Sequence, residues 1–332
     1  MTSRNLDSAG QRGWITRAGS AWALATALVL HASSHAALGN ITLVVATTPG
    51  TGSDILARTL SQQFSSRLGI VAVVDNRPGA SGNIGAEYVA RARPDGSVLL
   101  VAATTFATNA AVHPSLPYDP VKDFEPVALL GTGTLALVVP ASFSANTLGE
   151  FVAMAKANAD AINYASPGNG TPQHLAMELF KQEAGIKLFH VPFKGAAGAL
   201  NDLTGGHVSA MIAPVHTVGS LVKAGKLKML AVMSRERAAS WPAVPTFREQ
   251  GFANVQVDVW YGLFAPRGTA AATVQQLNEE VNQTLKSGEI AAGLARQGID
   301  VSGGAPAVMA QTLDSEIKRW PPVVRAAGIK AD

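Results

Sequence analysis

The 332-residue chain contains no cysteine, and this absence excludes a disulfide framework, a thiolate nucleophile and a cysteine-ligated zinc site. Charged residues make up only 15% of it, and no run of lysine or arginine suggests a surface stripe that binds nucleic acid. Beyond residue 36, the chain has no uninterrupted apolar stretch of about 18 residues, so we expect the mature protein to be soluble. Its stability must therefore come from a hydrophobic core, which a chain of this length can supply.

Signatures of catalysis are also missing. No G-x-S-x-G, G-x-x-x-x-G-K-[ST] or H-E-x-x-H motif is present. Residues 131–136 match G-x-G-x-x-A, but strand-like residues follow them where a phosphate-binding helix would have to begin. We interpret the histidines beyond residue 36 as structural and Asp202 and Asp258 as isolated acids. We therefore expect no enzymatic activity, no catalytic residues, no cofactor and no metal site.

The first 36 residues have the layout of a Sec-type signal peptide. Arg4, Arg12 and Arg17 precede an apolar stretch at residues 18–30, and residues 34–36 offer small residues for cleavage after Ala36. An uncleaved anchor is the alternative, although the apolar stretch is short for a membrane span. Removal of residues 1–36 lowers the formal net charge from +3 to +1, so much of the basicity of the chain belongs to this leader.

Strand-like and helix-like segments alternate along the rest of the chain, which favours an α/β architecture with largely parallel sheets. We predict strands at 41–46, 70–75, 97–102, 127–130, 135–139, 162–165, 187–191, 208–212, 228–233 and 255–264, and helices at 52–68, 83–92, 147–158, 172–184, 196–203, 215–224, 270–286, 289–297 and 306–326. The runs 135–140 and 255–266 are interpreted as crossings between two lobes. Lobe 1 then comprises residues 37–138 and 258–332, and lobe 2 comprises residues 139–257. A cleft between two such lobes is a common place for a small ligand.

The most informative segment joins a strand to a helix at residues 44–60. An apolar run ends at Pro49-Gly50, and from Leu56 onward apolar residues recur at helical spacing. Thr51 and Asp54 have the spacing of a capping box. The exposed N-terminus of a helix offers unpaired N–H groups and a partial positive charge, which suit a carboxylate or a phosphate. A plain strand–helix connector is the alternative interpretation.

A second turn, at residues 166–172, has the same physical design. Thr171 suits the N-cap of the following helix, and Pro172 suits its first position. Gly168 and Gly170 permit positive φ angles or a close approach of the backbone. Two such turns, one in each predicted lobe, would hold an anion from both sides.

Two further segments are candidates on weaker grounds. Thr104 and Thr105 end a strand and either donate hydrogen bonds to a ligand or cap the next short helix. Lys194 lies between a strand end and a helix start, where it either pairs with an anion or is simply solvated.

Short segments with a characteristic order and spacing occur along nearly the whole chain, from about Ile41 to Lys330. They are Pro49-Gly50 with Asp54, residues 75–79 (DNRPG), 82–85 (GNIG), 94–96 (PDG), 116–124 (LPYDPVKDF), 163–166 (NYAS), 168–171 (GNGT), 190–195 (HVPFKG), 224–227 (AGKL), 262–266 (GLFAP) and 327–330 (AGIK). In these segments the chain resembles the substrate receptors of the tripartite tricarboxylate transporter system, the TctC or Bug family of periplasmic binding proteins.

The resemblance implies an α/β fold of the two-lobed periplasmic-binding-protein type (type II-like), with two crossing strands and a central ligand cleft. It also implies a receptor in the periplasm that captures a small organic carboxylate, largely through backbone amides and ordered water, and delivers it to a membrane permease. Carried over by position, the ligand-binding residues are Thr47, Thr48, Pro49, Gly50, Thr51, Gly52, Ser53, Asp54, Thr104, Thr105, Ser166, Gly168, Asn169, Gly170, Thr171, Lys194 and Ala213. We expect a monomer without a nucleic-acid partner.

The chain departs from the family pattern at two places. Thr47 stands where the family usually has a bulky aromatic residue, and Thr51 stands where it has a glycine, so we expect a roomier pocket with added hydroxyl groups. After Met211, some relatives that bind amino acids carry an acid that pairs with the ligand ammonium, whereas this chain has Ile212-Ala213-Pro214. A carboxylate with an uncharged aliphatic or aromatic remainder is therefore the expected ligand. A ligand-sensing receptor for a signalling partner and a secreted α/β hydrolase are the alternative functions.

Overall fold

The computed structural model describes residues 38–158 and 162–330, so the predicted signal peptide lies outside the described residues. Ten strands form one mixed sheet in the order β2-β1-β3-β9-β4-β7-β5-β6, with β8 and β10 also paired to β4. The strands are β1 (Ile41–Val45), β2 (Ala72–Asn76), β3 (Val98–Ala103), β4 (Phe124–Pro140), β5 (Asn163–Ser166), β6 (Phe189–Pro192), β7 (Ala210–Pro214), β8 (Leu227–Val232), β9 (Asp258–Pro266) and β10 (Ile299–Val301).

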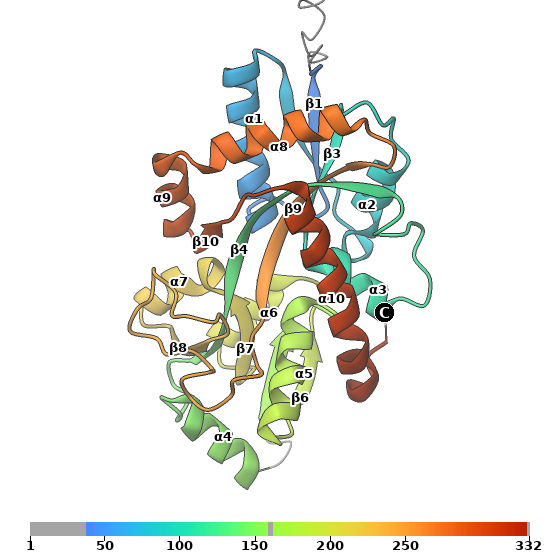
Figure 1. The fold of residues 1–332 in the computed structure, drawn as a ribbon. Helices are drawn as coiled ribbons and strands as arrows, with labels where there is room; N and C mark the ends of the chain where they lie inside the picture. The colour runs from blue at the N-terminus through green and yellow to red at the C-terminus, as the bar shows by residue number, and fades with distance from the viewer. Residues whose placement is uncertain (1–37, 159–161, 331–332) are drawn as a thin grey trace, which may run out of the picture. The chain divides into compact units, whose positions relative to one another are not determined.

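Helices cover both faces of this sheet (Figure 1). They are α1 (Gly52–Leu68), the short 3-10 helix η1 (Ala80–Gly82), α2 (Asn83–Ala90), α3 (Thr105–Val112), α4 (Leu148–Ala157), α5 (Pro172–Ala184), α6 (Ala196–Thr204), α7 (Val215–Lys223), α8 (Ala271–Leu285), α9 (Gly288–Arg296) and α10 (Pro306–Ala327). No helix among the described residues combines the length and the apolar character that a membrane crossing requires.

The long strand β4 divides the sheet into two halves. Its residues from Phe124 to Thr134 pair with β9, and its residues from Leu135 to Pro140 pair with β7 and β8. We call β1, β2, β3, β9, β10 and the first part of β4 sheet half A, and β5 to β8 with the second part of β4 sheet half B. In half A, α1 and α8 pack on one face and α2, α3 and α10 on the other; in half B, α4 and α5 pack opposite α6 and α7.

The pairing of strands corrects the expectation of largely parallel sheets. β1 pairs in parallel with β2 and β3, and β5 pairs in parallel with β6 and β7. The strands that link these groups are antiparallel, because β9 pairs with β3 and β4, and β4 pairs with β7 and β8. Parallel βαβ units therefore build each half, and antiparallel crossing strands connect the two.

A single strand also replaces the two that we predicted at 127–130 and 135–139. Residues 131–134 continue the pairing with β9 after a register shift between Leu129 and Gly131, and their glycines make this possible. A Cβ at Gly133 would lie 3.0 Å from the phenol oxygen of Tyr261, and one at Gly131 would lie 2.6 Å from the carbonyl oxygen of Asp300. The G-x-G-x-x-A motif is thus a strand whose glycines admit close neighbours.

Helix α1 shows how sequence pattern becomes packing. Leu56, Leu60 and Phe64 recur every four residues, so they lie on one face of the helix, and all three are fully buried. Each buried side chain of this size stabilises the fold by about 2 kcal/mol. The face packs on β1, β2 and β3, which fixes the N-terminus of α1 at the carboxyl end of β1.

Candidate functional site

A cavity of about 690 Å³ opens where the two sheet halves meet. It is lined by the connections that follow β1, β2, β3, β5 and β6 and by the beginnings of the helices after them. Eight of the residues that we expected at a ligand site line it: Thr47, Thr48, Thr51, Thr105, Gly168, Asn169, Thr171 and Lys194. The others, which are Pro49, Gly50, Gly52, Ser53, Asp54, Thr104, Ser166, Gly170 and Ala213, are not among the lining residues. Contact with a ligand stays a prediction for all of them.

The first turn brings Thr47 and Thr51 to the cavity at the N-terminus of α1. The two hydroxyl oxygens lie 2.7 Å apart, and the Thr51 hydroxyl also donates to the carbonyl oxygen of Thr48 at 3.1 Å. Thr51 has the extended backbone of an N-cap, but its side chain accepts no hydrogen bond from the helix. The hydroxyl groups therefore bond to each other and to the turn, which leaves the first N–H groups of α1 without a side-chain partner from this residue.

Asp54 does not line the cavity, but its carboxylate holds the first turn by hydrogen bonds. One carboxylate oxygen accepts hydrogen bonds from the backbone N–H of Gly50 at 2.9 Å and from Arg58 at 3.0 Å, and the other accepts from Asn76 at 3.0 Å. Burial opposes ionisation, but these hydrogen bonds together hold the pKa of Asp54 below its ordinary value. The predicted capping box is wrong in its hydrogen-bond partners. The Asp54 carboxylate accepts from the N–H of Gly50, and the Thr51 hydroxyl bonds to other residues of the turn.

Gly52 is required by a contact that the sequence does not show. A Cβ at this position would overlap the phenol ring and oxygen of Tyr261, which comes from β9. Tyr261 is buried, and burial raises its pKa well above the ordinary value, so the phenol stays neutral. The crossing strand β9 therefore packs directly against the N-terminus of α1.

The second turn is held by its own hydroxyl groups. Ser166 donates to the carbonyl oxygen of Gly168 at 3.0 Å, and Thr171 donates to the same oxygen at 2.8 Å. Thr171 also accepts from the backbone N–H of His174 at 3.4 Å, which confirms it as the N-cap of α5. Gly168 and Gly170 have φ angles of +149° and +70°, where a residue with a side chain would be strained.

Thr104 and Thr105, which follow the end of β3, have different surroundings. Thr105 lines the cavity, whereas Thr104 is fully buried and accepts a hydrogen bond from the backbone N–H of Trp260 at 2.9 Å. Thr104 forms no side-chain cap on α3, so the capping alternative is wrong for it. Its hydroxyl instead fixes the end of β3 to the crossing strand β9.

One wall of the cavity was missed by the sequence analysis. The loop from Gly79 to Gly82 lines it, and its four residues have φ angles of +124°, +46°, +55° and +90°. Asn109 of α3 supports this loop by donating to the carbonyl oxygen of Ser81 at 3.0 Å. Left-handed backbone at two successive residues with side chains is costly and tends to occur at functional sites. The glycines flanking Ala80 and Ser81 were the available signal, and we had used them only as part of a family motif.

A hydrogen-bonded group beneath this loop holds the start of α2. Asn83 accepts from Asn109 at 2.7 Å and from the phenol of Tyr118 at 2.7 Å. Burial raises the pKa of Tyr118 to about 12, so it remains a neutral donor. The wall formed by the loop is therefore rigidly supported from the side of α3.

The charge and polarity of the lining are uneven. None of the lining residues is an aspartate or a glutamate, and Lys194 carries the only formal charge. Leu100, Phe106 and Phe193 supply apolar surface between the polar turns. The arrangement suits a small anion that has an apolar part, because its charge can face amide groups and Lys194 while its remainder faces hydrocarbon.

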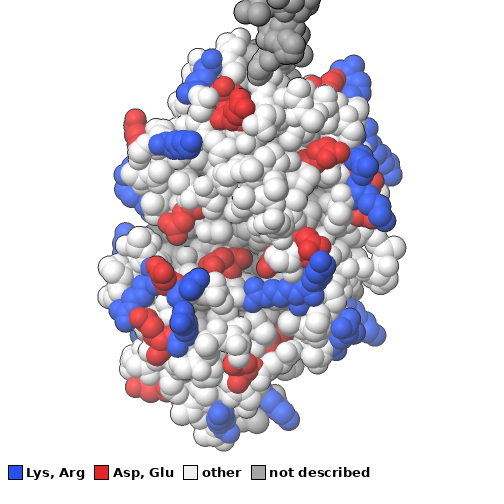
Figure 2. All heavy atoms as spheres, viewed as in Figure 1, with Lys and Arg blue, Asp and Glu red and all other residues white. Residues whose placement is uncertain are grey.

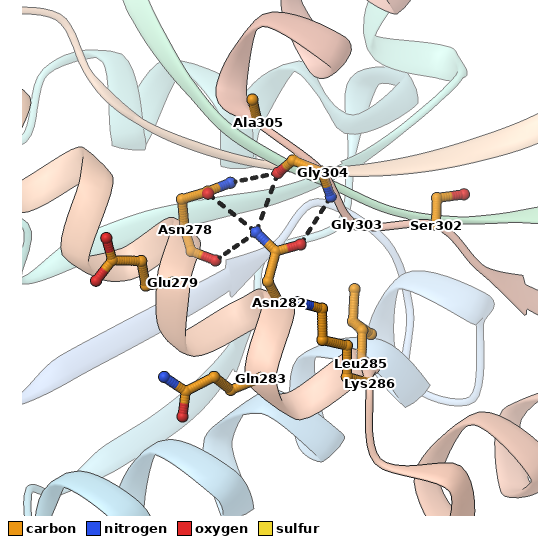
Figure 3. A pocket seen from close by; sticks show the side chains of 10 residues that line it. All are labelled: Asn278, Glu279, Asn282, Gln283, Leu285, Lys286, Ser302, Gly303, Gly304 and Ala305. Atoms are coloured by element: carbon orange, nitrogen blue, oxygen red, sulfur yellow. Dashed lines mark hydrogen bonds between the residues drawn. The ribbon is translucent and has the colours of Figure 1, made fainter.

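A second hollow, of about 520 Å³, lies between α8 and the connection from β10 to α10 (Figure 3). Two of its polar side chains are already engaged, since Asn278 donates to the carbonyl oxygen of Gly304 at 2.8 Å and Asn282 accepts from the N–H of Gly304 at 2.7 Å. These amides fasten the connection to α8. Figure 2 shows that basic and acidic side chains are interspersed over the face of the molecule that is seen in Figure 1.

Comparison with known proteins gives consistent results along the chain. Residues 56–329 match the family model described as the tripartite tricarboxylate transporter family receptor. A protein encoded in the tcbD-tcbE intergenic region of Pseudomonas sp. strain P51 is 37% identical over 281 residues, which are 84% of each chain. BugT of Bordetella pertussis is 33% identical over 292 residues, which are 87% of this chain and 90% of BugT.

Solved structures show the same likeness. Rpa4515 of R. palustris with adipate has a TM-score of 0.82 and 34% identity, covering 88% of this chain and 98% of its own. MatC of Rhodopseudomonas palustris with bound malate has a TM-score of 0.78 and 34% identity, covering 86% and 99%. The periplasmic binding protein BugD has a TM-score of 0.79 and 30% identity, covering 88% and 98%. The predicted two-lobed α/β fold is confirmed by these neighbours.

Proposed function

Because the chain belongs to the tripartite tricarboxylate transporter receptor family of periplasmic solute-binding proteins, we propose that it captures a small organic carboxylate in the cavity between its sheet halves. We further propose that it is exported by its leader and hands the ligand to the permease subunits of a membrane transporter. The observation that carries the ligand class is the lining of the cavity, which has amide-rich turns, one cation and no acid.

Recognition of the carboxylate would come mainly from the first and second turns. The two turns that lead into α1 and α5 are held in place before the ligand arrives, because Asp54 accepts from the N–H of Gly50 and Thr171 donates to the carbonyl oxygen of Gly168. Backbone donors in such preorganised turns bind an anion with little loss of conformational freedom. The lining residues Thr47, Thr48, Thr51, Thr105, Gly168, Asn169, Thr171 and Lys194 are the proposed contacts, and the remaining predicted residues shape the turns behind them.

The same lining argues against an amino-acid ligand. A ligand ammonium group buried in the cavity would need a carboxylate partner, and the lining offers none. Ala213 lies on β7, is fully buried and does not line the cavity. A carboxylate with an uncharged remainder satisfies the site more completely.

For the movement that closes the cavity we propose the lobe bounds 37–138 with 258–332 and 139–257. The start of β9 at Asp258 supports the second bound, whereas the change of pairing partner on β4 lies between Thr134 and Leu135, four residues before the first bound. Hinges at the ends of crossing strands would let the lobes rotate while each keeps its own core. A monomer is sufficient for this mechanism.

The receptor role is tested by ligand-induced stabilisation of the purified chain. Adipate, malate, hexanoate, benzoate and glutamate form a suitable panel. A ligand at 100 times its dissociation constant stabilises the native state by about 2.7 kcal/mol, which raises the unfolding midpoint by about 5 °C in a protein of this size. We expect such a shift with at least one carboxylate and none with glutamate. Absence of any shift and of any heat of binding across the panel, in protein freed of bound ligand, would refute the proposal.

A signalling receptor is the second candidate, because the same capture of ligand can serve a sensor partner. Deletion of the gene, followed by measurement of ligand uptake and of the transcriptional response, separates the two. Loss of uptake supports transport, and loss of the response alone supports signalling.

A further inference from the structure

Two imidazole rings are stacked beneath the second turn, at residues 166–171. His174 of α5 and His190 of β6 have ring centroids 3.9 Å apart and planes inclined by 19°. Tyr164 of β5 stacks on His190 with centroids 4.8 Å apart, and its ring centroid lies 6.2 Å from that of His174. His174 is only 5% exposed, and neither histidine lines the cavity. The pair therefore belongs to the layer that supports the ligand site.

His174 holds the turn through a lone pair. Its Nδ1 atom accepts a hydrogen bond from the backbone N–H of Gly170 at 3.1 Å. An imidazole nitrogen can accept only when it carries no proton, so His174 is neutral in this geometry and its proton is on Nε2. Nε2 lies 3.9 Å from a carboxylate oxygen of Glu178, which is four residues along the helix. The sequence analysis had overlooked this spacing of His174 and Glu178.

His190 engages the same turn at its other end. Its Nε2 atom lies 2.7 Å from the hydroxyl oxygen of Ser166. The Ser166 hydroxyl donates to the carbonyl oxygen of Gly168 at 3.0 Å and accepts from the N–H of Gly168 at 3.2 Å. The two histidines thus bond to both ends of the Gly168–Gly170 segment, of which Gly168 and Asn169 line the cavity.

The surroundings of the pair are already balanced in charge. One oxygen of Glu178 accepts from the phenol of Tyr164 at 2.5 Å and from the ammonium group of Lys181 at 2.6 Å. Lys181 also lies 5.4 Å from the centre of the Tyr164 ring. A proton added to either imidazole would leave this buried group with an excess positive charge, and a second would place two cations face to face.

The other elements packed against α5 do not offset such a charge. α3 contributes the uncharged Thr108 and Val112, and β7 carries no titratable side chain between Ala210 and Pro214. On α10, Asp314 pairs with Lys318, Glu316 pairs with Arg319, and Arg325 lies in the last turn.

Gly170 links this layer to the opposite side of the cavity. Its carbonyl oxygen accepts a hydrogen bond from Thr108 of α3 at 3.2 Å, and a Cβ at this position would lie 2.7 Å from Val112 of the same helix. His174 therefore holds the N–H of the residue whose carbonyl is held by α3. Movement of this glycine changes the second turn and its contact with α3 together.

We propose that His174 is a positioning residue for the ligand site, and that a proton on its Nδ1 releases Gly170 and weakens ligand capture in acid. The protonated ring would point an N–H group at the N–H of Gly170, and two donors at this distance repel each other. The stacked His190 opposes relief by rotation of the ring toward it. The effect on capture rests on the proposed function, whereas the coupling between His174 and Gly170 does not.

The coupling is tested by NMR on the ligand-free chain labelled with ¹⁵N. We expect Nδ1 of His174 to be unprotonated at pH 8, and the amide signal of Gly170 to shift along the titration curve of His174. The proposal is overturned if Nδ1 carries the proton at pH 8, or if the Gly170 amide is unaffected while His174 titrates. This measurement needs neither a ligand nor a variant.

The effect on capture is tested by calorimetry with adipate as the probe, at pH 8, 6.5 and 5.5. The variant His174→Asn keeps an acceptor at the position of Nδ1 but takes up no proton in this range. One proton changes affinity by at most about tenfold per pH unit. Below the pH at which the NMR titration shows His174 taking up its proton, the unmodified chain should therefore lose more affinity than His174→Asn, by up to about tenfold for each pH unit. Titration of adipate itself affects both proteins equally and cancels.

The matched control is His207→Asn, which removes a histidine whose side chain is 75% exposed and lies 3.7 Å from Asp202. It should keep the pH dependence of the unmodified chain. Equal pH profiles for the unmodified chain and His174→Asn would overturn the proposal. If adipate binds to none of these proteins at any pH, the ligand class proposed above fails for this probe, and the NMR titration still decides the role of His174.

Discussion

A carboxylate introduced at Thr51 should abolish ligand binding while leaving the fold intact. Thr51 is the N-cap of α1, lines the cavity and is partly exposed, so a longer side chain can be accommodated. A glutamate there also faces the positive end of the helix, which stabilises the native state by about 0.5 kcal/mol. The loss of the hydroxyl contacts to Thr47 and Thr48 costs about 1 kcal/mol and offsets this gain.

The expected loss of affinity follows from Coulomb repulsion. In Thr51→Glu the new carboxylate and that of the ligand would compete for the same N–H groups at a separation of about 4 Å. At an effective dielectric constant of about 20, two like charges at this separation repel by about 4 kcal/mol. Since about 1.4 kcal/mol corresponds to a tenfold change, the affinity should fall by about a thousandfold.

Calorimetry with the best carboxylate of the panel measures this loss, and two controls define its cause. Thr51→Gln has nearly the same shape without the charge, so it should lose far less affinity than Thr51→Glu. Thr59→Glu adds the same charge two turns further along α1, at a residue outside the lining, where salt screens the repulsion. The reasoning is refuted if Thr51→Glu binds as tightly as the unmodified chain, or if Thr51→Gln loses as much affinity.

Two further changes test the structure around the site. Gly52→Ala should destabilise the protein by about 2 kcal/mol, because its Cβ would overlap the phenol of Tyr261. Urea unfolding should show a lower midpoint for this variant. An unchanged midpoint would mean that Tyr261 is not packed on α1. Asp258→Asn should stabilise the protein at pH 7.5 and not at pH 3. Burial first, and then the nearby Asp300, raise the pKa of Asp258 to about 6; Arg319 opposes them, and Glu316 adds the smallest contribution. Because the carboxyl pKa is raised, ionised Asp258 destabilises the folded protein increasingly as the pH rises from about 4 to about 6. Above that range, Asp258→Asn should therefore raise the free energy of unfolding by about 2 kcal/mol. Urea unfolding at both pH values measures this, and an equal gain at both would contradict the assignment.

The sequence predicted most elements because their periodicity is local. α1 and α5 begin and end as expected, since apolar spacing, caps and flanking glycines agree there. α3 was anticipated only as a short helix without bounds, because the polar residues Thr108 and Asn109 are buried beside its apolar ones and interrupt the apolar pattern. β10 has three residues and was missed, because its position depends on pairing with β4 rather than on its own pattern.

In the candidate site, too, the features that depend on local sequence were predicted, and those that depend on distant partners were not. The turns at Thr51 and Gly168 were found because small residues between a strand and a helix are visible in the sequence. The inward orientation of Asp54 and the contact of Tyr261 with Gly52 were not, because both depend on partners distant in the chain or on the geometry of the turn. Sequence spacing thus indicated two turns that line the cavity, and long-range packing decided which of their residues do so.

The two turns that meet at the cavity should respond differently to acid. The first is held by an ionised Asp54, whose lowered pKa keeps its hydrogen bonds with Gly50 and Asn76 intact throughout the range in which an imidazole titrates. The second is held by neutral His174, whose acceptor atom is lost on protonation. An acid-induced loss of affinity between pH 8 and pH 5.5 that differs between the unmodified chain and His174→Asn must therefore arise in the second turn, because the first keeps its charge and its bonds over the same interval.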